Sequence, residues 1–179
     1  MSEIKVLHVM RPAEGGMRTH VFALLKKLNK KIFRPMAALP KNMVVDRKVL
    51  TEEIEIYPVD FYARPDLISD IKAVVQLVKI IRRNSIPLLH VHGARAGFVG
   101  RTAALLSGVP VVIYTVHNFI YKGDSPHWQK KACSLMERLY CRFTDMYITV
   151  SKALAEEVNR IDFIPEEKIT TVYNGIDLK

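Results

Sequence analysis

The first candidate for chemistry is a pair of adjacent glycines. Gly15 and Gly16 lie between an apolar run at residues 4–10 and a helical pattern at residues 17–28. Glycine lets the backbone approach a ligand closely, and the N-terminus of the following helix offers unpaired N–H groups and a partial positive charge to a phosphate. The spacing matches neither the dinucleotide fingerprint nor the P-loop. The pair predicts a phosphate contact, with a tight turn that binds no ligand as the open alternative.

Two histidines supply the second candidate. His92 and His117 come at the ends of apolar runs at residues 87–91 and 109–116. If those runs are neighbouring strands, both side chains lie at one rim, near the glycine pair. A neutral imidazole can donate to or accept from a sugar hydroxyl, so we expect His117 to contact a sugar or a phosphate. Histidines also bind zinc, but no nearby Cys or Glu completes a ligand set by its spacing, and we expect no metal.

The hydrophobic pattern alternates between strands and helices about seven times along the chain. The expected strands cover residues 4–10, 33–39, 54–59, 87–91, 109–116, 146–150 and 169–173, and the expected helices cover residues 17–28, 66–83, 94–106, 128–143 and 151–160. This order predicts a doubly wound, mainly parallel α/β sheet with helices on both faces. Such sheets bind ligands at the carboxyl ends of strands, where the strand order reverses. His8 and His90 lie within or close to predicted strands and are expected to be structural.

Two local predictions concern the elements themselves. The helix at 66–83 has basic residues outside an apolar stripe, and the residues expected to be buried are Leu67, Ile71, Val74, Val75, Val78 and Ile81. Pro35 falls in the run at 33–39, which places that strand near a sheet edge or puts the proline at a strand start.

Composition and charge limit the possible functions. The chain has 179 residues, which fits one domain. Hydrophobic residues make up 49% of the sequence and charged residues 25%, as in ordinary globular proteins. This composition excludes a disordered chain and a disulfide scaffold. The 27 Lys and Arg against 18 Asp and Glu leave a net charge of +9, which predicts anionic partners. Because the sequence has no aromatic RNA-binding strand, KH-type loop or zinc-finger spacing, we expect no nucleic-acid partner.

The sequence also suggests where the chain works. Its N-terminus has no signal-peptide pattern. Cys133 and Cys141 fall in the expected helix at 128–143, about 12 Å apart along its axis, which is too far for a disulfide. Both observations favour the cytoplasm. The basic faces of the helices at 17–28 and 66–83 could also hold the chain on the inner face of an anionic membrane.

Five short motifs, taken together, carry a resemblance to a known family. They are Gly15-Gly16, Leu88-Leu89-His90-Val91-His92-Gly93, Tyr114-Thr115-Val116-His117, Thr144-Asp145-Met146-Tyr147-Ile148-Thr149-Val150-Ser151 and Val172-Tyr173-Asn174-Gly175-Ile176-Asp177. In this order and spacing they resemble the N-terminal half of a family 4 retaining glycosyltransferase with the GT-B fold. The resemblance runs from Ile4 to Asp177.

The resemblance implies a fold and an activity. Members of the family have two Rossmann-like domains that face each other across a cleft, with the acceptor on the N-terminal domain and the nucleotide-sugar donor on the C-terminal one. By this likeness, residues 1–179 form a single Rossmann-like N-terminal domain, and the C-terminal donor-binding domain is absent from the chain. We expect the whole enzyme to transfer a sugar from a nucleotide-sugar donor to a lipid or saccharide acceptor in envelope or polysaccharide synthesis. The chain alone is expected to be inactive. The family is generally metal-independent, so no metal and no tightly bound cofactor is expected.

The resemblance also assigns roles to residues. Gly15 and Gly16 match the glycine loop that contacts donor phosphate or acceptor, and His117 matches the histidine that reaches the donor sugar, here the expected catalytic residue. Other residues are expected to bind the acceptor or to form the hinge between the domains: Arg18, Tyr62, Arg64, His92 and Asn118 for the acceptor, and Asn174 and Gly175 for the hinge. Tyr62 offers a stacking face, and Arg64 can hold an anionic group through two hydrogen bonds.

Two alternatives stay open at this point. The chain could be a basic α/β binding module for an anionic lipid or a nucleic acid, an interpretation that only the charge supports. It could also be half of another enzyme of the GT-B class, such as a phosphorylase or an epimerase.

Overall fold

The chain alternates strands and helices from end to end. The computed structural model describes residues 3–41, 43, 54–61, 66–118, 126–162 and 164–175. The strands are β1 (Ile4–Met10), β2 (Phe33–Pro40), β3 (Glu55–Val59), β4 (Leu88–His92), β5 (Val111–Val116), β6 (Met146–Thr149) and β7 (Ile169–Thr171). The helices are α1 (Gly16–Lys27), α2 (Leu67–Asn84), α3 (Ala94–Ser107), α4 (His127–Tyr140) and α5 (Lys152–Asp162), with 3-10 turns η1 (Cys141–Phe143) and η2 (Glu166–Lys168).

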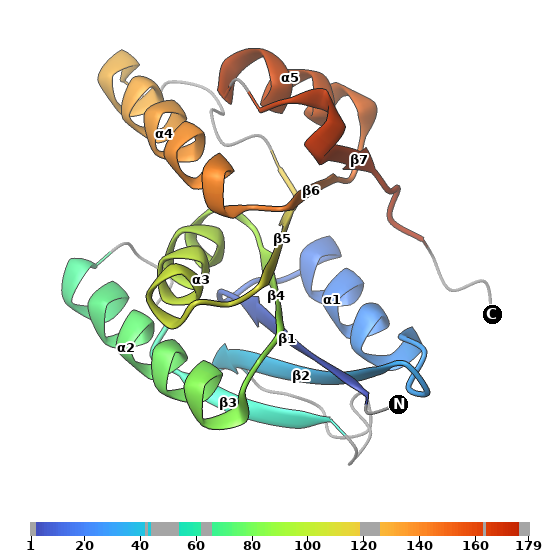
Figure 1. Ribbon diagram of the computed structural model, residues 1–179. Coiled ribbons are helices and arrows are strands. Elements are labelled where there is room, and N and C mark those ends of the chain that lie inside the picture. The colour runs from blue at the N-terminus through green and yellow to red at the C-terminus, as the bar shows by residue number, and fades with distance from the viewer. Residues whose placement is uncertain are drawn as a thin grey trace.

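The strands form one parallel sheet in the order β3-β2-β1-β4-β5-β6-β7. The order reverses between β1 and β4, which is where doubly wound sheets bind ligands. Helix α1 covers one face of the sheet, and α2 and α3 cover the other (Figure 1). The predicted Rossmann-like, doubly wound fold is therefore confirmed. Among the helices that the structure describes, none has the length and hydrophobicity needed to span a bilayer.

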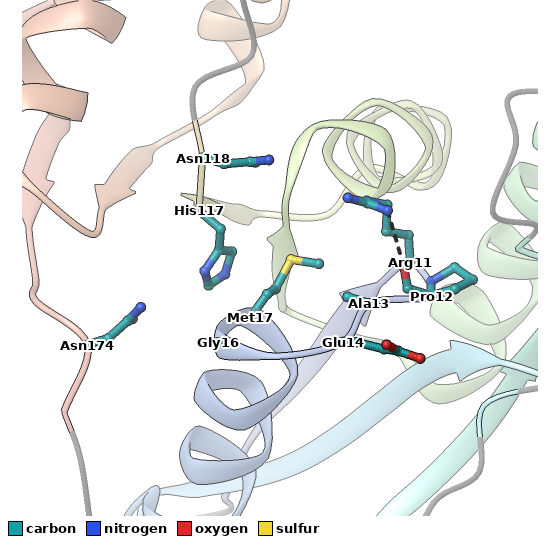
Figure 2. Close-up of a pocket in the computed structure, with 9 residues that line it drawn as sticks. All are labelled: Arg11, Pro12, Ala13, Glu14, Gly16, Met17, His117, Asn118 and Asn174. Carbon is teal, nitrogen blue, oxygen red and sulfur yellow. Dashed lines mark hydrogen bonds between the residues drawn. The ribbon is translucent and has the colours of Figure 1, made fainter. Parts of the chain in front are cut away.

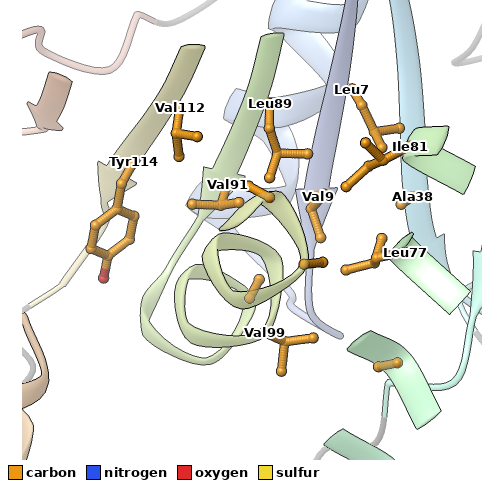
Figure 3. Close-up of a cluster of buried hydrophobic side chains, with 14 of the residues drawn as sticks. Leu7, Val9, Ala38, Leu77, Ile81, Leu89, Val91, Val99, Val112 and Tyr114 are labelled. Carbon is orange, nitrogen blue, oxygen red and sulfur yellow. The ribbon is translucent and has the colours of Figure 1, made fainter. Parts of the chain in front are cut away.

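The two faces of the central strands differ in polarity. Leu7 and Val9 of β1 point toward α2 and α3, into the main hydrophobic core, together with Leu89 and Val91 of β4 (Figure 3). The alternate residues point toward α1, because successive side chains of a strand face opposite ways. Those of β1, β4 and β5 include buried polar side chains, namely His8, His90, His92 and Thr115. The sheet therefore presents a polar surface beneath α1.

Helix α3 packs unusually close to the sheet. A Cβ atom placed on Gly100 would lie 2.5 Å from Val91 Cγ1, and one on Gly97 would lie 3.0 Å from the Tyr114 ring. Such distances leave no room for a side chain at Gly100. The two glycines thus fix α3 against β4 and β5, the strands that lead into His92 and His117.

A buried ion pair joins α3 to α4. Arg101 is 1% exposed, and its guanidinium donates to both carboxylate oxygens of Glu137, at 2.6 and 2.8 Å. The same group lies over the rings of Tyr114 and Tyr140, 4.4 and 4.6 Å from their centroids. Although burial alone would lower the pKa of Arg101, the Glu137 carboxylate raises it overall, so the arginine stays charged.

The predicted buried stripe of α2 is wrong in part. Leu67, Ile71 and Val75 are 75%, 55% and 47% exposed. Ile81 is buried as expected, and Val74 and Val78 pack partly against the core. The other residues buried on this helix are Ser69, Ala73 and Leu77. Small side chains at two of these positions let α2 approach α3, and hydrophobicity alone gives no signal for such a contact.

Two smaller expectations are settled by the structure. Pro35 is the third residue of β2, which lies between β1 and β3. The strand is thus next to the edge strand β3, and Pro35 lies near the strand start, before the pairing with β3 begins at Met36. Cys133 and Cys141 form no disulfide, as expected.

Candidate functional site

The carboxyl ends of the central strands surround one cavity of about 540 Å³. It is lined by Arg11, Pro12, Ala13, Glu14, Gly16, Met17, His117, Asn118 and Asn174. Figure 2 shows His117 facing the start of α1, with Asn118 and Asn174 at the rim. The parallel register explains the convergence, because Met10 pairs with His92 and His92 pairs with Thr115. The three strands therefore end level with one another.

Gly15 and Gly16 form the sharp entry to α1. Gly15 has φ 70°, a conformation that side-chain-bearing residues rarely adopt. Helix α1 starts at Gly16, and the carbonyl of Gly15 accepts the first helical hydrogen bond, from the Thr19 N–H at 3.1 Å. No side chain caps this helix terminus. Its first N–H groups are thus available to an anionic group at the rim of the cavity.

The cavity wall continues into a cluster of histidines. Five of the six histidines in the chain, His8, His20, His90, His92 and His117, lie in ring contact with one another. His92 is central: its Nε2 lies 3.1 Å from His8 Nδ1, and its Nδ1 lies 3.4 Å from His117 Nε2. His20 reaches the cluster from α1, with its ring 5.2 Å from that of His117.

Burial keeps these rings neutral. Burial, with a smaller contribution from the nearby His20, lowers the pKa of His117 to about 4. Burial also brings the pKa of His92 well below the ordinary value. For His20, burial lowers the pKa and a hydrogen bond with Asn174 opposes that shift. At neutral pH each ring therefore offers one donor and one acceptor nitrogen.

His8 and His90 have the structural positions that the sequence predicts. Both are buried, and His90 Nε2 lies 2.7 Å from Thr115 Oγ1. Among the described residues, His8 Nε2 has no hydrogen-bond partner. The burial of His8 lowers its pKa to about 3. The His8 and His90 rings thus pack against the His92 ring.

Some of the predicted site residues line the cavity, and others lie outside it. Gly16, His117, Asn118 and Asn174 line the cavity. His92 lies behind His117, and Gly175 lines a second cavity of about 660 Å³ together with His20. The other two predicted residues at the rim, Gly15 and Arg18, are not among the lining residues, and the Arg18 guanidinium lies over the Phe22 ring. Tyr62 and Arg64 fall outside the described residues.

Sequence reasoning missed His20, Arg11 and Glu14. Arg11 and Glu14 line the cavity from the loop after β1. His20 lies one turn into α1, four residues after Gly16. Since residues four apart share one face of a helix, the spacing from the glycine pair is the signal that could have found it.

Comparison with known proteins adds a family match. Residues 14–179 match the family model described as Glycosyltransferase Family 4. The chain is 29% identical over 113 residues to the UDP-Gal:alpha-D-GlcNAc-diphosphoundecaprenol alpha-1,3-galactosyltransferase of Escherichia coli. The aligned region covers 63% of this chain and 29% of that protein. It is also 26% identical to an uncharacterized 41.2 kDa protein in the cps region of Klebsiella pneumoniae, over 98% of this chain and 48% of that protein.

Solved structures show the same fold. The crystal structure of Anabaena Alr3699/HepE in complex with UDP and glucose matches with a TM-score of 0.74 at 16% sequence identity, over 98% of this chain and 45% of that one. The chain thus spans half or less of the length of the proteins it matches.

Proposed function

Because the chain belongs to glycosyltransferase family 4, we propose that it is the acceptor-side domain of a retaining transferase. In this proposal the enzyme moves a sugar from a nucleotide-sugar donor to a lipid or saccharide acceptor, in the synthesis of an envelope or polysaccharide glycoconjugate. The observation that carries the proposal is the cavity at the strand ends, where Gly16, His117 and Asn174 meet from three separate parts of the chain.

Each group at the cavity has a role in this proposal. The N–H groups at the start of α1 and the Arg11 guanidinium stabilise negative charge on a phosphate. The neutral His117 imidazole, our proposed catalytic residue, forms a hydrogen bond with a hydroxyl of the transferred sugar. Asn118 supplies a further amide contact to the acceptor, and Asn174 and Gly175 form the hinge. Since dipoles and cations hold the charge of the leaving group, transfer requires no metal ion.

The names of two similar proteins support the substrate classes. The Escherichia coli relative is named for UDP-Gal and a diphosphoundecaprenol acceptor, and the Anabaena structure holds UDP and glucose. We propose a nucleotide sugar as the donor and a sugar-diphosphate lipid as the acceptor. The donor binds mainly to a second, C-terminal domain, so this chain does not catalyse transfer by itself.

The surface supports a further part of the proposal, which is peripheral attachment to the inner face of an anionic membrane. Helix α2 exposes Leu67, Ile68 and Ile71, and its sequence also carries four basic residues, Lys72, Lys79, Arg82 and Arg83. Apolar side chains next to basic ones are typical of helices that lie in the headgroup region of a bilayer.

The test compares the two substrates on the chain itself by calorimetry. We expect a soluble sugar-diphosphate prenol analogue to bind at least about tenfold more tightly than UDP-galactose or UDP-glucose, a free-energy difference of about 1.4 kcal/mol. Tighter binding of a nucleotide sugar than of the acceptor would contradict the acceptor-side assignment. Sustained sugar transfer by the chain alone would contradict the need for a second domain.

A further inference from the structure

The sheet surface beneath α1 carries more imidazole groups than a phosphate and sugar site requires. One ring nitrogen from each of His20, His92 and His117 lies within 4.8 Å of the other two. These residues come from α1, β4 and the end of β5, so the fold brings them together from three distant segments. We infer that His20, His92 and His117 form a binding site for a divalent transition metal ion such as zinc.

The distances fit three imidazoles around one ion. Zinc–nitrogen bonds of about 2.0–2.1 Å in tetrahedral geometry hold two ligand nitrogens roughly 3.4 Å apart, and His92 Nδ1 lies 3.4 Å from His117 Nε2. The ring centroids are 5.6 Å apart for His92 and His117, 5.2 Å for His20 and His117, and 6.2 Å for His20 and His92. Imidazoles bound to one zinc have centroids roughly 5 Å apart, so a small rotation of His20 closes the set.

The surrounding residues orient the proposed ligands. Metal-binding histidines usually donate their second ring N–H to a fixed acceptor. His92 Nε2 lies 3.1 Å from His8 Nδ1, so an N–H on Nε2 leaves Nδ1 with its lone pair toward His117. His20 is held by its hydrogen bond with Asn174. Two of the three ligands are thus positioned by neighbours.

Access favours this set over a second one. His8, His90 and His92 also meet the spacing for a metal site, but all three are buried. By contrast, His20 and His117 are partly exposed, and the cavity reaches His117. It provides an entry path and room for a water molecule as the fourth ligand.

A metal ion here has a consequence for the proposed transfer. The ion occupies His117 Nε2, which lies 3.4 Å from His92 Nδ1, and the proposed function places a sugar hydroxyl against the same imidazole. Binding of metal and binding of sugar at His117 therefore exclude each other, and zinc inhibits the enzyme. This consequence rests on the proposed function, whereas the metal site rests only on the geometry of the three histidines.

The experiment titrates the apo chain with zinc chloride by calorimetry, and with cobalt chloride by visible absorption. We expect one ion per chain and the absorption of tetrahedral cobalt. His20→Ala and His117→Ala each remove one ligand, and each weakens zinc binding by at least about tenfold. His127→Ala is the matched control, because His127 is exposed on α4, outside the cluster, and it leaves the affinity unchanged.

The outcomes separate the metal site from the proposed function. Circular dichroism confirms that each variant is folded, and two independent ligand variants keep the test decisive if one of them unfolds. The inference is overturned if the chain binds no zinc, or if His20→Ala and His117→Ala bind it as tightly as the unaltered chain. The second result would place the ion elsewhere, as in the His8, His90 and His92 set. Neither result depends on whether the chain binds a sugar.

Discussion

The buried imidazoles beneath α1 make stability depend on pH. Burial lowers the pKa of His8 to about 3 and that of His117 to about 4, against about 6.5 in an unfolded chain. As the pH falls below 6.5, these histidines bind protons in the unfolded chain but stay neutral in the folded chain. The histidine contribution to stability is therefore fully present above about pH 6.5 and is lost as the pH falls toward 4.

The measurement is urea denaturation at pH 7.5, 6.5 and 5.5, a window above the range in which most carboxylates titrate. We expect the free energy of unfolding to change little between pH 7.5 and 6.5 and to fall clearly by pH 5.5. Each ring that stays neutral when folded accounts for up to about 1.4 kcal/mol per pH unit below 6.5. Stability that stays level or rises at pH 5.5 would contradict the burial of these rings.

The Arg101–Glu137 pair gives a second prediction at the residue scale. Glu137→Gln leaves the buried Arg101 charge without its carboxylate, and we expect a loss of about 3 kcal/mol in unfolding free energy. The double variant Arg101→Met/Glu137→Met removes both charges and should lose less than the single one. Lys41→Met is the control, because Lys41 is exposed and its pair with Asp60 at 2.8 Å is worth under about 1 kcal/mol. Equal losses for Glu137→Gln and Lys41→Met would contradict the buried pair.

Residues differ in how far the sequence reveals them. Gly16, His117 and Asn174 follow predicted strands, so the rule for the carboxyl ends of parallel sheets places them together. Arg101 and Glu137 belong to two separate helices, and nothing local to either shows that they meet. The sequence does not reveal His20, because in the pattern of α1 it occupies an ordinary polar position.

At the scale of elements, α3 is fixed by the glycines that face the sheet. Gly100→Ala places a methyl group 2.5 Å from Val91 Cγ1, and overpacking of this kind costs about 1–3 kcal/mol. The better helix propensity of alanine returns up to about 1 kcal/mol, so we expect a net loss in urea denaturation. Gly16→Ala is the matched control, because no atom lies within 4 Å of its added Cβ. A Gly100→Ala variant as stable as Gly16→Ala would contradict the close packing.

The elements also show where hydrophobic pattern fails. Strand and helix positions follow the predicted ranges closely, because period and turn residues are local properties. The buried face of α2 differs in part from the prediction, because the small residues Ser69 and Ala73 are buried and larger apolar residues are exposed. The face that a helix buries depends on the elements that pack against it, and the sequence of one helix does not identify those elements.

At the scale of the whole molecule, the exposed face of α2 carries the membrane proposal. Ile68 is 65% exposed, and we expect Ile68→Asp to weaken sedimentation with vesicles of anionic phosphatidylglycerol. Ile32→Asp is the matched control, since Ile32 is 48% exposed and precedes β2, away from α2. We also expect the unaltered chain to bind anionic vesicles more strongly than neutral phosphatidylcholine ones. Equal binding to the two lipids would refute electrostatic attachment.

The sheet as a whole explains why the fold was predictable. Alternating strands and helices leave few topologies open, since crossover connections between parallel strands are right-handed. The sequence does not state the strand order, however. The reversal between β1 and β4 is what brings the glycine pair and His117 to one rim, and it depends on long-range pairing.

The central claim is that this chain binds the sugar-diphosphate acceptor in the cavity lined by Gly16, Asn118 and Asn174, where His117 reaches the transferred sugar. The most direct measurement is a titration of the isotope-labelled chain with a soluble sugar-diphosphate prenol analogue, followed by NMR of the backbone amides and histidine rings. We predict saturable shifts centred on Gly16, Asn118 and Asn174, and weaker binding in Asn118→Ala, which removes the proposed amide contact to the acceptor. Saturable shifts confined to the surface groove lined by Ala155, Asn159 and Thr171, with Gly16 and His117 unmoved, would contradict the account.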